Sequence, residues 1–189
     1  MRLVLASTSP RRLELVRRLG VEPARVAAPA IDEAPSKAEL PRAYAVRMAA
    51  EKAAAVERFP DEVVLAGDTA IALGRRVLPP ADTPEAQREL LRMLSGRRHH
   101  CLSAVCVVGP DGRVRTRLSD TLVAFKPLTA AEIDAYLDSG EGLGKAGGYA
   151  IQGRAEAFVR FLHGSHSGVM GLPLFEARAL LRAAGLPVG

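Results

Sequence analysis

Asparagine and tryptophan are absent from this sequence of 189 residues, and cysteine occurs only twice. Cys101 and Cys106 form neither a CxxC pair nor a cysteine–histidine spacing, which excludes a disulfide-stapled scaffold and a zinc-finger-like site. No hydrophobic run approaches the roughly 20 residues of a membrane-spanning helix. The first residues form a short strand-like run that soon meets Arg11 and Arg12, unlike a secretory signal peptide. We therefore expect a cytoplasmic protein that has no membrane partner.

Aromatic residues are also scarce, at 4%, and lysine supplies only four of the 26 basic side chains. The net charge of +5 would suit a nucleic-acid surface. The sequence nevertheless has no RNP motif, no helix-turn-helix signature and no aromatic-rich basic stretch, so we expect no nucleic-acid partner. Genome composition accounts for the excess of arginine. Against that background each lysine is notable, because a rare lysine tends to occur where an arginine cannot replace it. The four lysines are Lys37, Lys52, Lys126 and Lys145.

The remaining composition is that of an ordinary globular domain. Hydrophobic residues make up 48% and charged residues 25%, and a chain of this length buries about 70% of its unfolded surface. Intrinsic disorder and fibrous repeats are thereby excluded. We expect a single unit over residues 1–189, either one large domain or two small lobes that share a core.

Strand-like and helix-like segments alternate along the chain, and one hairpin interrupts the alternation. This order predicts a mixed sheet in an α/β fold. The expected strands are residues 2–6, 25–31, 62–66 with a continuation at 70–73, 100–108, 114–125 and 157–162. The expected helices are residues 10–19, 41–59, 84–95, one that follows a capping box at 129–132, and 173–185.

The segment Ser7-Thr8-Ser9-Pro10-Arg11-Arg12 joins the first strand to the first helix. A helix N-terminus presents free N–H groups and the positive end of the helix dipole. Hydroxyl groups and arginine side chains add donors that suit phosphate oxygens. Two adjacent arginines in a first helical turn also suggest an anionic partner. The pattern predicts a phosphate site, with a capped helix and solvated arginines as an equal alternative.

Carboxylates follow two of the expected strands. Asp68 lies in Gly67-Asp68-Thr69, directly after an apolar strand, and Asp32 and Glu33 follow the second strand. Ligand sites of open α/β sheets lie at strand ends. A carboxylate there can bind a divalent metal or act as a general base on water. A turn-capping aspartate and a solvated acidic loop are the alternatives.

Two stretches of small residues complete the candidate site. Residues 145–153 place Lys145 and Gln152 in a glycine-rich loop, whose backbone can approach a ligand closely. Residues 164–173 form a second such loop, and its His166 belongs to no ordered Ser-His-Asp arrangement. We expect His99 and His100 to be structural.

Five segments in this order resemble the Maf family of nucleoside triphosphate pyrophosphatases, from residue 3 to about 185. They are Leu5-Ala-Ser-Thr-Ser-Pro-Arg-Arg12, Glu51-Lys-Ala53, Ala66-Gly-Asp-Thr69, Lys145-Ala-Gly-Gly-Tyr-Ala-Ile-Gln-Gly153 and Gly171-Leu-Pro-Leu174. The resemblance implies an inosine-triphosphatase-like fold, an elongated mixed sheet in two lobes with the active site in the cleft between them. It also implies cleavage between the α and β phosphates with Mg²⁺ or Mn²⁺, in a role that removes nucleotides from the cellular pool.

The resemblance also implies roles for individual residues. Asp68 matches the family's proton acceptor, and Glu33 with Asp68 would hold the metal. The positions linked to base choice in the dTTP/UTP branch are Arg11, Thr69 and Gln152, and the other polar positions of the cleft are Ser7, Arg12, Lys52 and Lys145.

The sequence departs from the family pattern after the third strand. The usual lysine of Gly-Lys-Pro is replaced by Pro79, so we expect Arg75 or Arg76 to supply the lost cation. The usual asparagine before Val169 is Gly168, a change that we expect to matter less. A nucleotide-binding regulator of cell division is the alternative function, and the sequence leaves a monomer and a homodimer both open.

Overall fold

A computed structural model describes all 189 residues and places seven strands in one sheet. The strands are β1 (Arg2–Ala6), β2 (Arg25–Ala27), β3 (Glu62–Leu73), β4 (Arg76–Leu78), β5 (Arg98–Val108), β6 (Val114–Phe125) and β7 (Val159–His163). Their order is β2-β1-β3-β5-β6-β7, and β4 pairs with the far end of β3. β1 runs parallel to β2 and β3, whereas the other pairs are antiparallel. The sheet is therefore mixed, as predicted.

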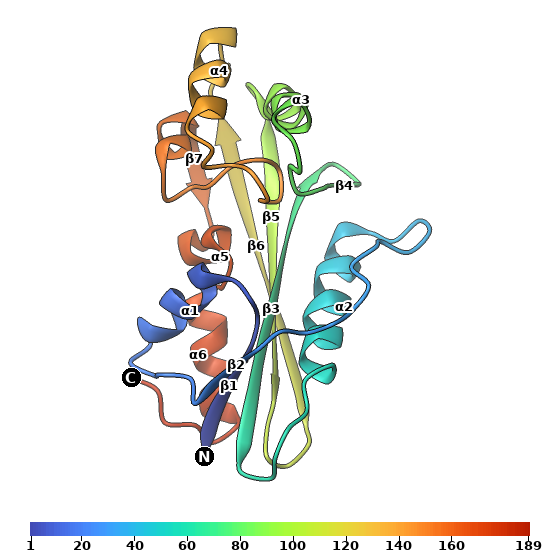
Figure 1. Cartoon of the computed structure of the whole chain (residues 1–189), viewed down its shortest axis with the longest axis vertical. Helices are drawn as coiled ribbons and strands as arrows, with labels where there is room; N and C mark the ends of the chain where they lie inside the picture. The colour runs from blue at the N-terminus through green and yellow to red at the C-terminus, as the bar shows by residue number, and fades with distance from the viewer.

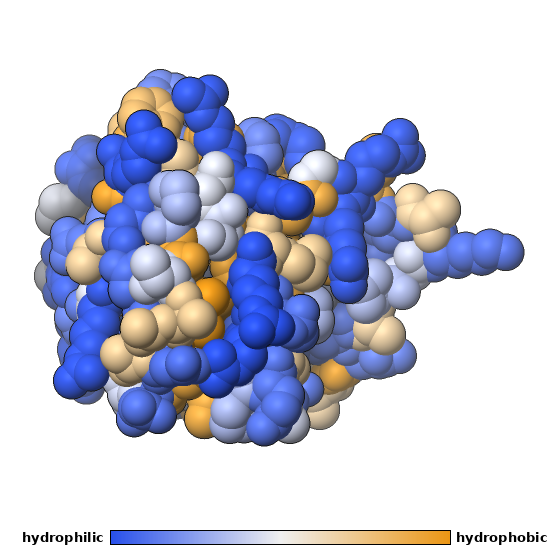
Figure 2. Space-filling model, turned by 90° about the horizontal axis from the view of Figure 1, so that it is seen from above, coloured by the Kyte–Doolittle hydropathy of each residue, from blue (hydrophilic) through white to orange (hydrophobic).

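Helices cover both faces of this sheet. They are α1 (Pro10–Arg17), α2 (Pro41–Ala54), α3 (Pro84–Leu94), α4 (Ala130–Asp138), the 3-10 helix η1 (Arg154–Phe158), α5 (His166–Met170) and α6 (Leu174–Ala183). Figure 1 shows α2 on one side of the central strands and α1, α5 and α6 on the other. The predicted capping box is present, since Thr129 and Glu132 bond to each other's backbone N–H groups at the start of α4. None of these helices is long and apolar enough to cross a membrane. Hydrophilic residues cover most of the face seen in Figure 2, with smaller hydrophobic areas between them.

The alternation of side chains along β3 separates two hydrophobic cores. Val63, Leu65 and Ile71 join a cluster of 31 buried residues that also includes side chains of α1, α3, α4 and α6. Val64 and Ala66, which point the opposite way, join a cluster of 15 residues packed against α2. The larger cluster runs the length of the molecule, past both the α1–α6 end and the α3–α4 end in Figure 1. One continuous core thus supports both ends of the elongated sheet.

Several element boundaries differ from the sequence predictions. The predicted interruption at residues 67–69 is wrong, because all three residues pair with β5 and β3 continues unbroken to Leu73. The second strand and second helix end earlier than expected, at Ala27 and Ala54. β4 and α5 were not predicted, since both are short and their residues resemble a turn and a flexible loop.

Candidate active site

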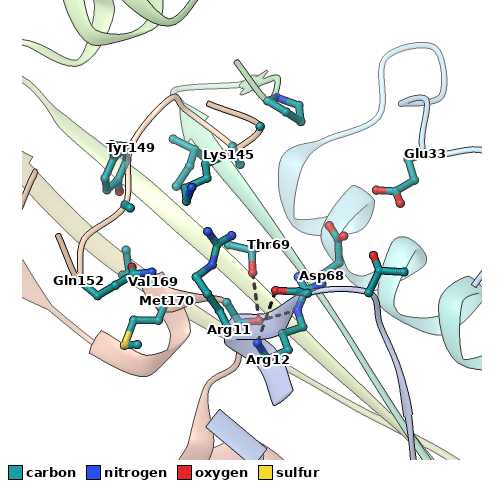
Figure 3. A pocket seen from close by; sticks show the side chains of 18 of the residues that line it. Arg11, Arg12, Glu33, Asp68, Thr69, Lys145, Tyr149, Gln152, Val169 and Met170 are labelled. Carbon is teal, nitrogen blue, oxygen red and sulfur yellow. Dashed lines mark hydrogen bonds between the residues drawn. The ribbon is translucent and has the colours of Figure 1, made fainter. Parts of the chain in front are cut away.

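The pocket that holds most of the predicted site residues lies where one edge of β3 is uncovered. β1 pairs with β3 only as far as Ala66, and β4 begins to pair at Ile71. Residues 67–70 remain bonded to β5 along the opposite edge, which holds this part of the strand in place. Because neighbouring side chains of a strand point to opposite faces, the gap gives access to both faces of the sheet. Asp68 points toward α2 and Thr69 toward α5 (Figure 3).

On the α2 face, Lys52 lies between two carboxylates. Its ammonium donates to Asp68 Oδ1 at 2.7 Å and to Glu33 Oε2 at 2.9 Å. Asp68 and Lys52 are only 5% and 6% exposed, whereas Glu33 stands on an exposed loop. A buried charge is tolerated when an opposite charge is paired with it, so each of these two buried groups depends on the other.

Small side chains on the sheet explain how Lys52 reaches Asp68. The β3 residues that flank Asp68 on this face are Ala66 and Ala70, and both are packed against α2. Alanine lets a helix axis approach the sheet closely, which brings the last turn of α2 over the strand. The Tyr44 hydroxyl of the same helix donates to the Glu33 carbonyl at 2.9 Å and holds the acidic loop beside the site.

The first turn of α1 supplies two cations. Arg12 Nε donates to the Gly171 carbonyl at 2.8 Å, and Ser9 caps the helix by accepting from the Arg12 N–H. Arg11 makes no hydrogen bond within the protein, and burial lowers its pKa. Burial also lowers the pKa of Arg12, an effect that the nearby Asp68 charge opposes. Both guanidinium groups reach the pocket (Figure 3).

A glycine-rich loop forms the opposite wall. Its backbone is fixed to the segment after β4, where Gly147 N–H donates to the Pro79 carbonyl at 3.1 Å and Ala81 N–H to the Lys145 carbonyl at 3.2 Å. Gly147 has a φ of +68°, and a Cβ there would lie 3.0 Å from Ile71, so only glycine fits. Lys145 therefore projects into the pocket, where burial and the positive charge of Arg11 lower its pKa.

The charges of the pocket do not balance. Lys52 is the one of its four cations that is paired with a carboxylate, whereas Arg11, Arg12 and Lys145 have no ion pair within the protein. All three line the same cavity as Asp68, together with Thr69, Tyr149 and Gln152. Cations that are partly withdrawn from water without a countercharge favour an anionic ligand. The arrangement suits a polyphosphate placed beside a buried carboxylate.

Comparisons with known proteins agree with this geometry. Residues 2–184 match the family model described as Maf-like protein. The chain belongs to the Maf family. It is 70% identical over 188 residues to a protein of Sphingopyxis alaskensis named dTTP/UTP pyrophosphatase, covering 99% of this chain and 98% of that protein. A protein of the same name from Novosphingobium aromaticivorans is 60% identical over 187 residues, covering 98% and 93%.

The fold of this Maf protein also occurs in a distant solved structure. A HAM1 protein from Coxiella burnetii superimposes with a TM-score of 0.51 at 14% sequence identity, over 97% of this chain and 99% of that one. Identity this low supports similarity of fold alone. It agrees with the mixed-sheet α/β architecture that the sequence predicted.

Eight of the nine predicted site residues of this Maf protein line the pocket, and Ser7 does not. The eight residues are Arg11, Arg12, Glu33, Lys52, Asp68, Thr69, Lys145 and Gln152. Ser7 is buried beneath the site, where its hydroxyl accepts from the Ser9 N–H and from Arg12 Nη1. The structure therefore assigns Ser7 to the support of Arg12. The predicted acidic partner Asp32 also lies outside the lining, and its carboxylate accepts from the Ala34 N–H.

Other groups at the site were not assigned by sequence reasoning. Tyr149 closes one side of the pocket, and Val169 and Met170 of α5 form an apolar wall (Figure 3). Ser103 lies on β5 opposite Thr69, and its hydroxyl is hydrogen-bonded to the Thr69 hydroxyl. The only sequence signal for Ser103 is a polar residue within an apolar strand, and its partner is 34 residues away.

The expected replacement for the missing family lysine is wrong. Arg75 and Arg76 are exposed at the turn between β3 and β4, and neither lines the pocket. The segment at Pro79–Ala81 instead hydrogen-bonds with the loop that carries Lys145. Lys145 is thus the cation that the structure places beside this segment.

His99 predicts a dependence of stability on acid pH. Its Nε2 bonds to the Tyr149 hydroxyl at 2.9 Å, and burial lowers the His99 pKa to about 4. Between about pH 6.5 and pH 4, His99 is protonated in the unfolded chain but not in the native state. The contribution of His99 to the free energy of unfolding is therefore fully present above pH 6.5 and is lost as the pH falls toward 4. We expect a loss of up to about 3 kcal/mol, measured by urea denaturation across this range.

The control variants for this prediction are His99→Phe and His163→Gln. Phenylalanine fits the ring cluster that His99 forms with Phe125 and Tyr149, and this variant should lose most of the acid dependence. His163 is exposed, and its replacement should preserve the profile of the parent. An unchanged pH profile in His99→Phe would assign the effect to other groups.

Proposed function

We propose that this Maf protein hydrolyses dTTP and UTP between the α and β phosphates, releasing a nucleoside monophosphate and pyrophosphate. The observation that carries the proposal is the set of three cations without ion pairs that share a cavity with the buried Asp68. The names of the relatives support the substrate. Removal of particular nucleotides from the cytoplasmic pool is the role that we propose for this reaction. One chain supplies every group named here, so the proposal requires no partner macromolecule.

In the proposed reaction Asp68 accepts a proton from the water that attacks the α phosphorus. Its position beside the cationic wall suits this role, because a general base must lie within hydrogen-bond reach of the attacking water. Lys52 donates to Asp68 and to Glu33 and keeps the third of its N–H groups for a phosphate oxygen. Arg12 and Lys145 would stabilise the negative charge that develops on the departing pyrophosphate, and Arg11 would anchor the base from the side of α1.

Glu33 and Asp68 suit a divalent metal that arrives with the substrate. They are hard oxygen donors on either side of the Lys52 ammonium. No cluster of three or more potential ligand side chains is present. Mg²⁺ commonly binds to one or two carboxylates together with substrate phosphates, and this donor set fits that pattern. When bound, the metal supplies charge neutralisation and polarisation of the phosphoryl group.

Chelation of the metal is expected to abolish hydrolysis. Without a divalent cation, the carboxylates of Glu33 and Asp68 repel the polyphosphate that the pocket would otherwise attract. Pyrophosphate release should fall to background in excess EDTA and return when Mg²⁺ or Mn²⁺ is added beyond the chelator. Full turnover in EDTA would contradict the metal requirement.

A side-by-side assay of nucleoside triphosphates tests the substrate directly. Thr69 and Gln152 can pair with the carbonyl and N3–H groups of a pyrimidine, and such a site rejects a base that leaves them unpaired. We expect kcat/KM for dTTP and UTP to exceed that for ATP and GTP at least about tenfold. One methyl group is worth only about 1 kcal/mol, so dTTP and dUTP should differ little. A clear purine preference would contradict the base assignment.

A nucleotide-binding regulator of cell division is the second candidate. Such a protein gains nothing from a buried carboxylate beside a polyphosphate, because like charges repel. The position of Asp68 therefore favours catalysis. The same assay decides between the two, since a regulator would bind the nucleotide without releasing pyrophosphate.

A further inference from the structure

Thr69 belongs to a row of three hydroxyl residues that crosses the sheet. The register places Thr69 on β3 opposite Ser103 on β5, and Ser103 opposite Ser119 on β6. Directly opposite residues of antiparallel strands share one face of the sheet. Only Thr69 lines the pocket, while Ser103 and Ser119 are 1% and 7% exposed. Ser103 is thus a buried hydroxyl in direct contact with a pocket residue.

The direction of the hydrogen bond between Ser103 and Thr69 follows from the neighbouring groups. Ser103 Oγ lies 2.5 Å from the Gly168 carbonyl oxygen, which can only accept. A hydroxyl has one hydrogen, so Ser103 donates it to Gly168 and turns a lone pair toward Thr69. The opposite arrangement would place two unprotonated oxygens 2.5 Å apart. Thr69 Oγ1, at 3.0 Å from Ser103 Oγ, is therefore the donor of that bond.

The Thr69 hydroxyl has no other hydrogen to offer. Its remaining partner within the protein is the Gly171 carbonyl at 3.4 Å, another acceptor, which Arg12 Nε already occupies at 2.8 Å. The Gly171 contact is the longer of the two and its oxygen already accepts from Arg12, so the Thr69 hydrogen stays on Ser103 and points into the protein. Only the lone pairs of Thr69 Oγ1 face the pocket. Toward a ligand, Thr69 is therefore a hydrogen-bond acceptor.

The Gln152 side chain, unlike Thr69, is not fixed as a hydrogen-bond donor or acceptor. Its side chain is exposed and makes no hydrogen bond within the protein. Rotation of the amide presents either an oxygen or an NH₂ group, so Gln152 can match a 4-oxo or a 4-amino substituent equally well. Of Thr69 and Gln152, only Thr69 can therefore distinguish a ring N–H from a ring nitrogen lone pair.

We infer that Ser103 is a positioning residue that holds Thr69 as a hydrogen-bond acceptor, so that the site selects bases with an N3–H over cytosine. Uracil and thymine carry a hydrogen on N3, whereas N3 of cytosine carries a lone pair that would oppose those of Thr69. The inference rests on the proposed pyrimidine triphosphate activity and adds the residues that distinguish one pyrimidine base from another.

The test compares kcat/KM for UTP and CTP in the parent protein, Ser103→Ala and Ser119→Ala. The parent should prefer UTP at least about tenfold, the scale of one hydrogen bond left unpaired. Ser103→Ala frees the Thr69 hydrogen to turn toward cytosine N3, so most of this preference should disappear. Ser119→Ala removes a matched buried hydroxyl that makes no hydrogen bond to Thr69, and it should retain the ratio of the parent. A purely structural role of Ser103 would lower both values and leave their ratio unchanged.

A second comparison shows whether Ser103 acts through Thr69. In a Thr69→Val background the hydroxyl to be oriented is absent, so Ser103→Ala should no longer change the UTP:CTP ratio. Ser103→Cys keeps a side chain of similar size with a weak acceptor, and it should reduce the ratio in the same direction if the alanine variant fails to fold. An unchanged ratio in the folded Ser103 variants, or a drop that persists in the Thr69→Val background, would overturn the inference.

Failure of the inference is distinguishable from failure of the proposed function. A parent that hydrolyses dTTP and UTP but treats UTP and CTP alike would overturn the role of Ser103 alone. A parent that releases pyrophosphate from none of the pyrimidine triphosphates would overturn both.

Discussion

Asp68→Asn is expected to lower kcat for dTTP at least about 100-fold while the protein stays folded. The substitution keeps the size of the side chain, and the amide oxygen can still accept from Lys52, which lies 2.7 Å from Asp68 Oδ1. What is lost is the negative charge that would receive a proton and attract a metal. Steady-state pyrophosphate release gives kcat, and a thermal melt verifies the fold.

Asp120→Asn is the matched control for this variant. Asp120 is an exposed carboxylate that bonds to Arg42 and His100 and lies outside the pocket lining. Its replacement also removes one paired negative charge, and activity should stay near that of the parent. If Asp68→Asn kept near-parental turnover, Asp68 would be neither the base nor a metal ligand.

Lys52→Met is expected to destabilise the fold by about 3–5 kcal/mol, the usual scale for breaking a buried ion pair. The sequence assigned Lys52 simply to substrate binding, but the structure gives it two carboxylate partners. Without the ammonium, Asp68 stays 5% exposed and loses its countercharge. Urea denaturation measures the loss, and kcat/KM should fall as well, because a phosphate contact disappears with the lysine.

Two further variants separate the ion pair from other effects of losing Lys52. Lys126→Met removes a more exposed pair with Glu132 at the start of α4, and it should cost less than about 1 kcal/mol. The double variant Lys52→Met with Asp68→Asn should recover much of the stability, because no unpaired buried charge remains. A Lys52→Met variant as stable as the parent would show that Asp68 does not depend on this ammonium.

The order of strands and helices could be predicted from the sequence because the signals that set it are local. Alternation and apolar runs identified β3 and β5, and the Thr129–Glu132 capping box identified the start of α4. The residue types of the site were also visible, since Asp68, Lys52 and Lys145 are unusual in their surroundings. These patterns depend on neighbours within a few positions, which a single sequence displays directly.

The tertiary structure alone decided how these residues work together. Whether Gly67–Thr69 interrupt a strand or continue it depends on pairing with β5, which begins some thirty residues later in the chain. The open edge of β3 results from where β1 ends and β4 begins. The sequence by itself determined the elements and the chemical groups of this protein. Packing of α2 on β3 determined that Lys52 faces Asp68, and strand register determined that Ser103 lies opposite Thr69, because contacts between distant segments arise only when the sheet is assembled.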